Sequence, residues 1–313
     1  MKSVKLFWIL LIITTFAARA QQDPQYSQNM FNHLAVNPGF AGNSGLINAS
    51  LLNRFQWVGF PGAPQTTAFD IDASLKLIGE NDGLGLSVVN DVAGYEKSVS
   101  LGVNYSWRTK VGNGMLGSGI SLGVLNKKLT PDWNSEEGGD IVNGSDPALP
   151  QQEVNGNLLE IGAGLFYNHK NYYLGLSVTH LNQATFSFEE EGQYSVKRHY
   201  YFTGGYSFPL DGGKIEVTPS FFLKSDAVNH QIDATCLVKY DNRIWGGIGF
   251  RPNDAVIILL GTELQNGLKL GYSYDISTSA LSAYNSGSHE LFVAYSIAFN
   301  KKKTHKYKSV RFL

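Results

Sequence analysis

The chain has 313 residues, among them 34 glycines, 16 tyrosines and 18 phenylalanines, while charged residues make up only 16%. This composition is typical of a protein built from strands and turns and unlike that of a helical cytosolic enzyme. Removing residues 1–20 leaves a net charge of −4 with histidines neutral, which argues against nucleic acid as a partner. The single cysteine, Cys236, excludes an internal disulfide framework, and on a strand we expect it to be a small apolar filler.

The N-terminus has the features of a secretory signal peptide, at residues 1–20. Lys2 and Lys5 precede the apolar run 6–13, and Ala18-Arg19-Ala20 is a small-x-small cleavage site. No apolar run of about eighteen residues follows, so a mature membrane protein of this sequence has to cross the bilayer as a β-barrel. The sequence therefore predicts an exported chain.

Residues 21–45 precede the first predicted strand and show no regular period. The turn signal Asn37-Pro38-Gly39 lies within them. The segment has too many apolar side chains for a free tail, namely Tyr26, Met30, Phe31, Leu34 and Phe40. We expect it to pack like a plug into the periplasmic mouth of the barrel or against a partner, and so to narrow the lumen.

Apolar and polar residues alternate with period two from residue 46 to residue 300, as in strands with one apolar and one polar face. The pattern is clearest near the C-terminus, where Leu268, Leu270, Tyr272 and Tyr274 alternate with Lys269, Gly271, Ser273 and Asp275. The last strand repeats it, with Phe292 as the exception. We predict an all-β fold, a transmembrane antiparallel β-barrel of the outer-membrane type with about 14 strands. The predicted strands are 46–55, 65–75, 83–91, 97–108, 114–126, 157–169, 171–180, 197–208, 213–224, 229–240, 243–250, 254–263, 266–275 and 288–300.

Short and long connections alternate along the predicted strands. Tight-turn signals such as Gly112-Asn113-Gly114 and Asn266-Gly267 follow even-numbered strands, whereas the long connections 129–156 and 182–196 follow odd-numbered ones. In an outer-membrane barrel the short turns are periplasmic, so we expect both termini in the periplasm and the 129–156 loop outside. A soluble β-sandwich is the alternative fold.

The chain ends in a basic tail, residues 301–313, after the last predicted strand. Its lysines and arginine would lie in the periplasm. The tail is either disordered or in contact with an acidic partner or the anionic lipid of the outer membrane.

A search for catalytic and ligand-binding motifs gives no positive result. Gly112-x-Gly114-x-x-Gly117 has the letters of a dinucleotide fingerprint, but a strand pattern follows it and no helix N-terminus is available for a phosphate. The seven histidines show no metal-ligand spacing. Asp70 and Asp72 are expected to be solvated carboxylates on a wet lumen wall. We therefore expect no enzymatic activity, no cofactor and no metal site.

Motifs spread along the mature chain resemble those of the PorP/SprF family of the type IX secretion system of Gram-negative bacteria. They are Gln22-Asp23-Pro24-Gln25-Tyr26-Ser27-Gln28, Met30-Phe31-Asn32, Asn37-Pro38-Gly39-Phe40-Ala41-Gly42, Arg54-Phe55-Gln56-Trp57-Val58-Gly59, Gly62-Ala63-Pro64-Gln65-Thr66, Gly83-Leu84-Gly85-Leu86, Asn90-Asp91, Gly271-Tyr272-Ser273-Tyr274-Asp275 and Gly287-Ser288-His289-Glu290. The region 129–196 carries little of the resemblance.

The resemblance implies an outer-membrane barrel that helps the type IX secretion system export or attach large surface proteins such as gliding adhesins. It also implies two kinds of partner, exported proteins carrying a C-terminal sorting domain and a periplasmic peptidoglycan-binding protein. An outer-membrane channel for small solutes is the alternative function, because strand number does not determine whether a barrel is open. An outer-membrane enzyme is a third class, and it would need clustered ionisable groups.

The last strand of a closed barrel has to pair with the first, because an open edge in lipid leaves backbone groups without hydrogen-bond partners. This pairing brings the ends of the chain together at the extracellular rim, where Arg54 has Asp275 and Glu290 as candidate partners. The residues expected at this rim are Arg54, Gln56, Trp57, Phe60, Pro64, Tyr274, Asp275, His289 and Glu290. Two roles are open for them, as a latch of the seam or as a docking site for an exported substrate.

Overall fold

The computed structural model describes residues 23–78, 81–130, 152–188 and 192–298. The predicted signal peptide, the basic tail and most of the 129–156 loop lie outside these ranges. The described part of the chain contains no helix of the length and hydropathy that a membrane span requires.

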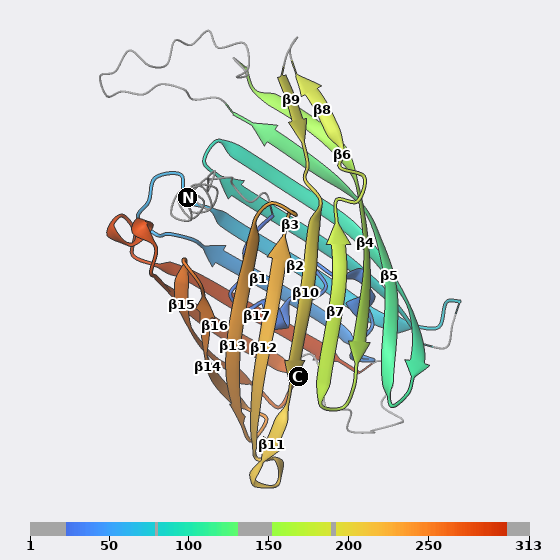
Figure 1. Cartoon of the computed structure of the whole chain (residues 1–313). Coiled ribbons are helices and arrows are strands. Elements are labelled where there is room, and N and C mark those ends of the chain that lie inside the picture. The colour runs from blue at the N-terminus through green and yellow to red at the C-terminus, as the bar shows by residue number, and fades with distance from the viewer. Residues whose placement is uncertain (1–22, 79–80, 131–151, 189–191, 299–313) are drawn as a thin grey trace, which may run out of the picture.

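The described residues form one closed antiparallel sheet (Figure 1). Its 14 barrel strands are β1 (Ile47–Phe55), β2 (Gln65–Leu75), β3 (Asp82–Ala93), β4 (Glu96–Val111), β5 (Gly114–Leu129), β6 (Val154–Asn168), β7 (Tyr172–Thr179), β10 (His199–Tyr206), β12 (Ile215–Ser225), β13 (His230–Tyr240), β14 (Ile244–Arg251), β15 (Ala255–Glu263), β16 (Leu268–Ser277) and β17 (Ser288–Ile297). β1 pairs with β17 and β10 pairs with β12, so the ring has no free edge. The predicted barrel is confirmed, and the alternative of a β-sandwich is wrong.

Several elements differ from the prediction. The hairpin of β8 (Thr185–Phe188) and β9 (Gly192–Ser195) lies within the connection predicted at 182–196. β11 (Phe208–Leu210) follows β10 and also pairs with β12. Short 3-10 turns occur at η1 (Asn29–Phe31), η2 (Pro38–Phe40), η3 (Asp211–Gly213) and η4 (Ala280–Ala283). Alternation alone does not show where a strand leaves the barrel wall, and this explains why these boundaries were missed.

One end of the barrel carries the two longest connections, between β5 and β6 and between β7 and β10, and is called the long-loop end here. The opposite end is the short-turn end. Long and short connections divide only partly between the two ends, because the connections 94–95, 226–229 and 252–254 at the long-loop end are also short.

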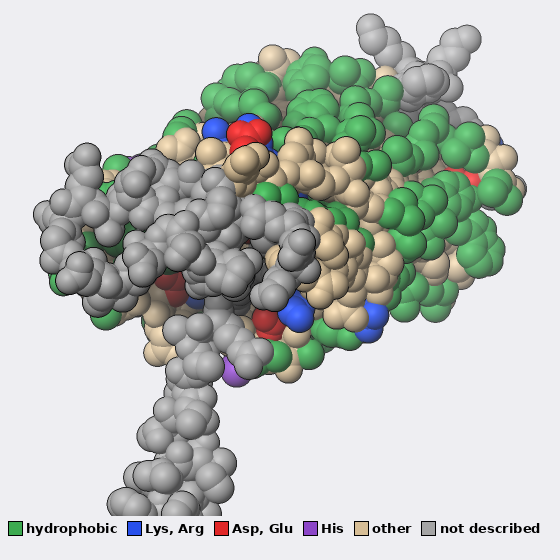
Figure 2. All heavy atoms as spheres, turned by 90° about the horizontal axis from the view of Figure 1, so that it is seen from above, with side chains coloured by type: hydrophobic (Ala, Val, Ile, Leu, Met, Phe, Trp, Pro, Cys, Tyr) green, Lys and Arg blue, Asp and Glu red, His purple; other side chains and the backbone are tan. Residues whose placement is uncertain are grey.

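The two faces of the wall follow the predicted alternation. Large hydrophobic side chains cover the outside, as Figure 2 shows, and many are about half exposed, including Leu101, Val103, Ile120, Leu122, Leu159, Leu176, Ile248, Leu260 and Leu291. A lipid bilayer is the solvent that such a surface requires. Cys236 lies on β13 and is exposed on this outer face, among the apolar side chains. Phe292, the exception to the pattern, points inward and is 1% exposed.

The N-terminal segment, residues 23–45, runs through the barrel, and most of its residues from Tyr26 to Gly42 are buried there. At the long-loop end Asp23 contacts His180, just after β7. Near the short-turn end the Gly42 N–H donates to Asp72 Oδ2 at 2.9 Å, so Asp72 is buried by the segment and is not a solvated lumen carboxylate. The expected position in one mouth of the barrel is therefore wrong, because the segment spans both ends.

This path separates the two described ends of the chain. Asp23 lies at the long-loop end, whereas β17 finishes at the short-turn end beside the start of β1. The two termini themselves, which were expected on one side, lie outside the described residues. The described ends are separated because the segment adds one further crossing of the barrel, which strand counting does not include.

Glycines in the wall of β5 and β6 let the segment approach the wall closely. A Cβ atom on Gly39 would lie 2.8 Å from the Gly117 carbonyl oxygen and 2.9 Å from the Gly164 carbonyl oxygen. A Cβ atom on Gly119 would overlap with Pro38 and Gly39. Contacts this short leave no room for a larger side chain, so the Pro38-Gly39 turn is seated directly on the backbone of the barrel.

Candidate functional site

A buried ion-pair network lies at the seam between β1 and β17. Arg54 faces Glu290 in the strand register, and its Nη1 lies 3.2 Å from Glu290 Oε2. Its Nη2 lies 2.8 Å from Asp275 Oδ2 on β16. The three side chains are at most 2% exposed. The structure thus places Arg54 against both predicted carboxylates, inside the lumen and not on an open rim.

A second guanidinium, which the sequence analysis missed, belongs to the same network. Arg251 Nε lies 2.7 Å from Asp233 Oδ1, and Nη1 lies 3.1 Å from Asp254 Oδ2 and 3.3 Å from Asp275 Oδ2. Alternation along β14 places Arg251 on the inner face with Trp245, so the pattern contained a signal for its orientation. The alternation gave no signal for which carboxylates pair with Arg251.

The N-terminal segment completes this network. The backbone N–H groups of Ser27 and Gln28 donate to the two carboxylate oxygens of Glu290 at 2.8 and 2.7 Å. The Ser27 hydroxyl donates to Asp275 Oδ2 at 2.7 Å and accepts from Arg54 Nη1 at 2.9 Å. Buried charges need such partners on every side, so the same residues that latch the seam also hold the segment.

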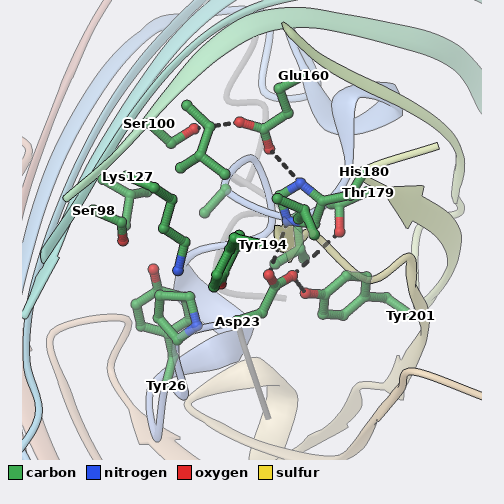
Figure 3. A pocket seen from close by; sticks show the side chains of 16 residues that line it. Asp23, Tyr26, Ser98, Ser100, Lys127, Glu160, Thr179, His180, Tyr194 and Tyr201 are labelled. Carbon is green, nitrogen blue, oxygen red and sulfur yellow. Dashed lines mark hydrogen bonds and ion pairs between the residues drawn. The ribbon is translucent and has the colours of Figure 1, made fainter. Parts of the chain in front are cut away.

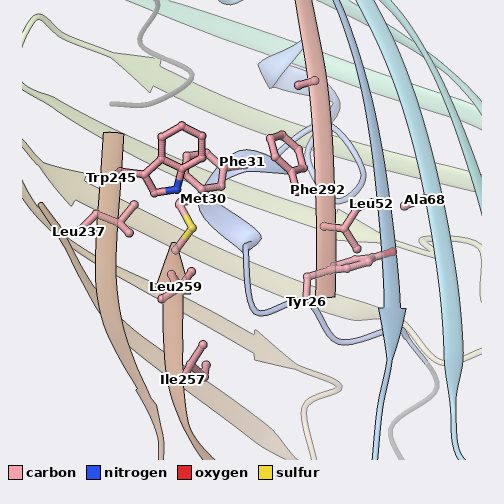
Figure 4. Close-up of a cluster of buried hydrophobic side chains, with 11 residues drawn as sticks. Tyr26, Met30, Phe31, Leu52, Ala68, Leu237, Trp245, Ile257, Leu259 and Phe292 are labelled. Atoms are coloured by element: carbon pink, nitrogen blue, oxygen red, sulfur yellow. The ribbon is translucent and has the colours of Figure 1, made fainter. Parts of the chain in front are cut away.

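An apolar cluster adjoins the ion-pair network. The Phe31 ring lies between Trp245 of β14 and Phe292 of β17, with centroid distances of 5.4 Å to each, and Met30 lies beside it (Figure 4). Tyr26 belongs to the same buried cluster. These side chains therefore pack inside the lumen. Contact with Phe31 also explains why Phe292 breaks the outward pattern of the last strand.

Most of the remaining predicted rim residues line two cavities, and Gln56 borders both. Gln56, Trp57 and Pro64 line a cavity of about 640 Å³ at the long-loop end, where Trp57 is half-buried. Phe60 and His289 line a second cavity of about 520 Å³, with Phe60 39% exposed. Near them the Tyr274 hydroxyl donates to the Ser286 carbonyl at 2.9 Å.

Asp23 is the centre of a further cluster that sequence spacing did not reveal (Figure 3). Asp23 Oδ1 lies 2.9 Å from His180 Nε2, and its Oδ2 lies 3.6 Å from His199 Nδ1 and accepts from the Tyr201 hydroxyl. On the other side of its ring, His180 Nδ1 lies 3.4 Å from Glu160 Oε1. The cluster joins the segment to β6 and to the connection between β7 and β10.

The charges of Asp23 and His180 stabilise each other. Burial alone would lower the pKa of His180, but the Asp23 and Glu160 carboxylates raise it to about 9. Burial would raise the pKa of Asp23, and the adjacent histidines hold that pKa well below its usual range. A cavity of about 80 Å³ opens beside these groups.

Comparison with known proteins gives one family, described as "Type IX secretion system membrane protein PorP/SprF", which matches residues 18–295. The chain belongs to the PorP/SprF family. It is therefore an outer-membrane β-barrel component of the type IX secretion system and not an enzyme. Its partners lie within that system. No curated protein matches the chain.

Solved structures share the fold of this PorP/SprF protein. A ΔS2S3 mutant of the monoaromatic hydrocarbon channel TodX is 10% identical, with a TM-score of 0.52 over 88% of this chain and 95% of that chain. The monoaromatic hydrocarbon channel CymD is 11% identical, with a TM-score of 0.51 over 88% and 93%.

Removing the Arg54 guanidinium should destabilise the barrel strongly. We expect Arg54→Ala to lower the free energy of unfolding by about 3–5 kcal/mol, because Glu290 and Asp275 then remain buried without this partner. The measurement is urea unfolding of the detergent-solubilised protein, followed by tryptophan fluorescence. Arg243→Ala is the control, since its 3.6 Å pair with Asp241 is more than half exposed and should contribute less than about 1 kcal/mol. Equal effects of the two substitutions would contradict this role for Arg54.

Proposed function

We propose that this PorP/SprF protein assists the export or surface attachment of large secreted proteins, such as gliding adhesins, as a docking and scaffold component. Family membership supports the secretion system as the setting. The observation that carries the docking role is that the protein's own N-terminal segment occupies the lumen. Ser27, Gln28, Phe31 and Asn37 fix it to walls on different sides of the barrel.

The loop between β1 and β2 is the surface we propose for docking. Hydrogen bonds order it, because the Val58 N–H donates to the Gly287 carbonyl at 2.8 Å and the Ser286 N–H donates to the Val58 carbonyl at 2.7 Å. Val58 and Phe60 are nevertheless 38% and 39% exposed. An ordered loop that presents apolar side chains suits protein contact, and exported proteins carrying a C-terminal sorting domain are the partners we propose for it.

We propose that the long-loop end faces the cell exterior and the short-turn end faces the periplasm. This orientation follows the usual direction of outer-membrane barrels. It places the end of β17 in the periplasm, near the peptidoglycan-binding partner, and it places Asp23 at the outer mouth. The docking loop lies at the same outer end, because it connects β1 with β2.

Protease accessibility tests the orientation. Protease added to intact cells should cleave within residues 129–156 before it cuts at Asp211-Gly212, because only the long-loop end should be reachable. Cleavage is read by mass spectrometry of the recovered fragments. Isolated outer membranes, open on both sides, are the control for intrinsic susceptibility. Preferential cleavage at Asp211-Gly212 in intact cells would invert the orientation.

Conductance separates the scaffold from a channel for small solutes. In planar bilayers we expect the whole protein to be electrically silent, since the segment fills the lumen. Deleting residues 24–41 should produce discrete conductance steps where the truncated barrel folds, which a heat-modifiable gel shift verifies. A steady open pore formed by the whole protein would favour the channel, and this outcome does not depend on whether the truncated barrel folds.

Docking is tested by pull-down from solubilised outer membranes. Phe60→Ser should leave the barrel folded, because the side chain is exposed, and should reduce the recovery of exported sorting-domain proteins at least several-fold. Val228→Ser is the matched control, since Val228 is 62% exposed in a different turn at the same end. Co-purifying proteins are quantified by mass spectrometry. Unchanged recovery with Phe60→Ser would exclude this loop as the docking site.

A further inference from the structure

The cluster at the outer end of the N-terminal segment has the composition of a metal site. Among the residues that the structure describes, Asp23, His180 and His199 each offer one ligand atom, and these atoms lie within 4.8 Å of one another. They come from three separate parts of the chain, namely the segment, the residue after β7 and the first residue of β10. Two imidazoles and one carboxylate are a common ligand set for Zn²⁺ and related divalent metals.

Once a metal ion displaces the proton that His180 Nε2 shares with Asp23, the surroundings of His180 match those of a metal-binding histidine. Its Nε2 faces Asp23 at 2.9 Å, while its Nδ1 faces Glu160 Oε1 at 3.4 Å. Metal-binding histidines commonly donate their second ring N–H to a carboxylate, which fixes the orientation of the ring. Glu160 itself is held, because the Ser100 hydroxyl donates to its Oε2 at 2.6 Å.

His199 supplies an independent observation that points to a ligand. It is 1% exposed, and its Nδ1 lies 3.0 Å from the Lys197 carbonyl oxygen. A carbonyl oxygen accepts only from a protonated nitrogen, so the lone pair of this ring belongs to Nε2. Among the residues that the structure describes, Nε2 is buried and has no hydrogen-bond partner, a costly condition that coordination to a metal would relieve.

The cluster has space and access for a further ligand. The cavity of about 80 Å³ is lined by Asp23, His180 and Tyr201, and it is large enough for several water molecules (Figure 3). The neighbouring ammonium of Lys224 donates to the Asp23 carbonyl oxygen at 3.1 Å and not to its carboxylate. A cation would therefore compete for the Asp23 carboxylate with His180, Thr179 and Tyr201 and not with Lys224.

We propose that Asp23, His180 and His199 bind a divalent transition metal ion, for which Zn²⁺ is the probe, with Glu160 as a positioning residue. The ion joins the N-terminal segment to the wall of the barrel at the long-loop end, while the Arg54 network holds the segment further along. Water from the cavity completes the coordination. The site thereby clamps the outer end of the segment.

Zinc binding by the purified whole chain tests the site. The protein is stripped with a chelator, dialysed against a buffered Zn²⁺ series, and its metal content is measured by inductively coupled plasma mass spectrometry. We expect one Zn²⁺ per chain. His199→Ala and Asp23→Asn should weaken binding at least about tenfold, and Glu160→Gln should weaken it about 10–100-fold through loss of the second ring contact. His230→Ala, which removes an exposed histidine at the same end, should change nothing.

Thermal unfolding gives a second measurement on the same proteins. Zn²⁺ should raise the unfolding midpoint of the wild type and of His230→Ala, because a ligand that binds the native state stabilises it. It should not raise the midpoint of His199→Ala. The proposal is overturned if the wild type holds less than half an equivalent of Zn²⁺, or if His199→Ala and Asp23→Asn bind it as tightly as the wild type. Either result would identify the cluster as an ion pair between His180 and its two carboxylates.

Discussion

The buried charges of Arg54 and Arg251 impose the central constraint on this barrel. A guanidinium away from water is tolerated only when carboxylates and hydrogen bonds surround it. Asp275 is shared by both, and Glu290 completes the coordination of Arg54. The network also requires Ser27, whose hydroxyl and N–H lie between these groups. The seam of the barrel and the position of the N-terminal segment therefore depend on one set of contacts.

Lipid outside and protein inside explain the composition of the strands. The outer face carries large apolar residues because it meets hydrocarbon, whereas the inner face combines charged residues with glycines. Those glycines are needed because the segment contacts the backbone of the wall, as Gly39 does at Gly117 and Gly164. Because the segment lies in the lumen, we propose that partners bind at the ends of the barrel.

The sequence alone determined the class of fold, the strand number and the closing pair of strands. Period two marks each strand that has lipid on one side, and an unpaired edge in lipid is too costly to exist, so the first and last strands must meet. The register of this closing pair of strands then brings Arg54 beside Glu290, and Asp275 lies on the next strand. The apolar residues Met30 and Phe31 also showed that the N-terminal segment had to be buried.

Only the tertiary structure decided the path of that segment and the residues it joins. Asp23 of the segment meets His180 and His199 of the wall, and Arg251 of β14 meets Asp275 two strands away on β16; neither set of contacts follows a sequence period. The segment contains only two short 3-10 turns, so nothing in its pattern shows which end of the barrel it enters or how far it reaches. Strand periodicity reports which side of the wall a residue faces. The partner inside the lumen depends on how the whole chain packs in three dimensions.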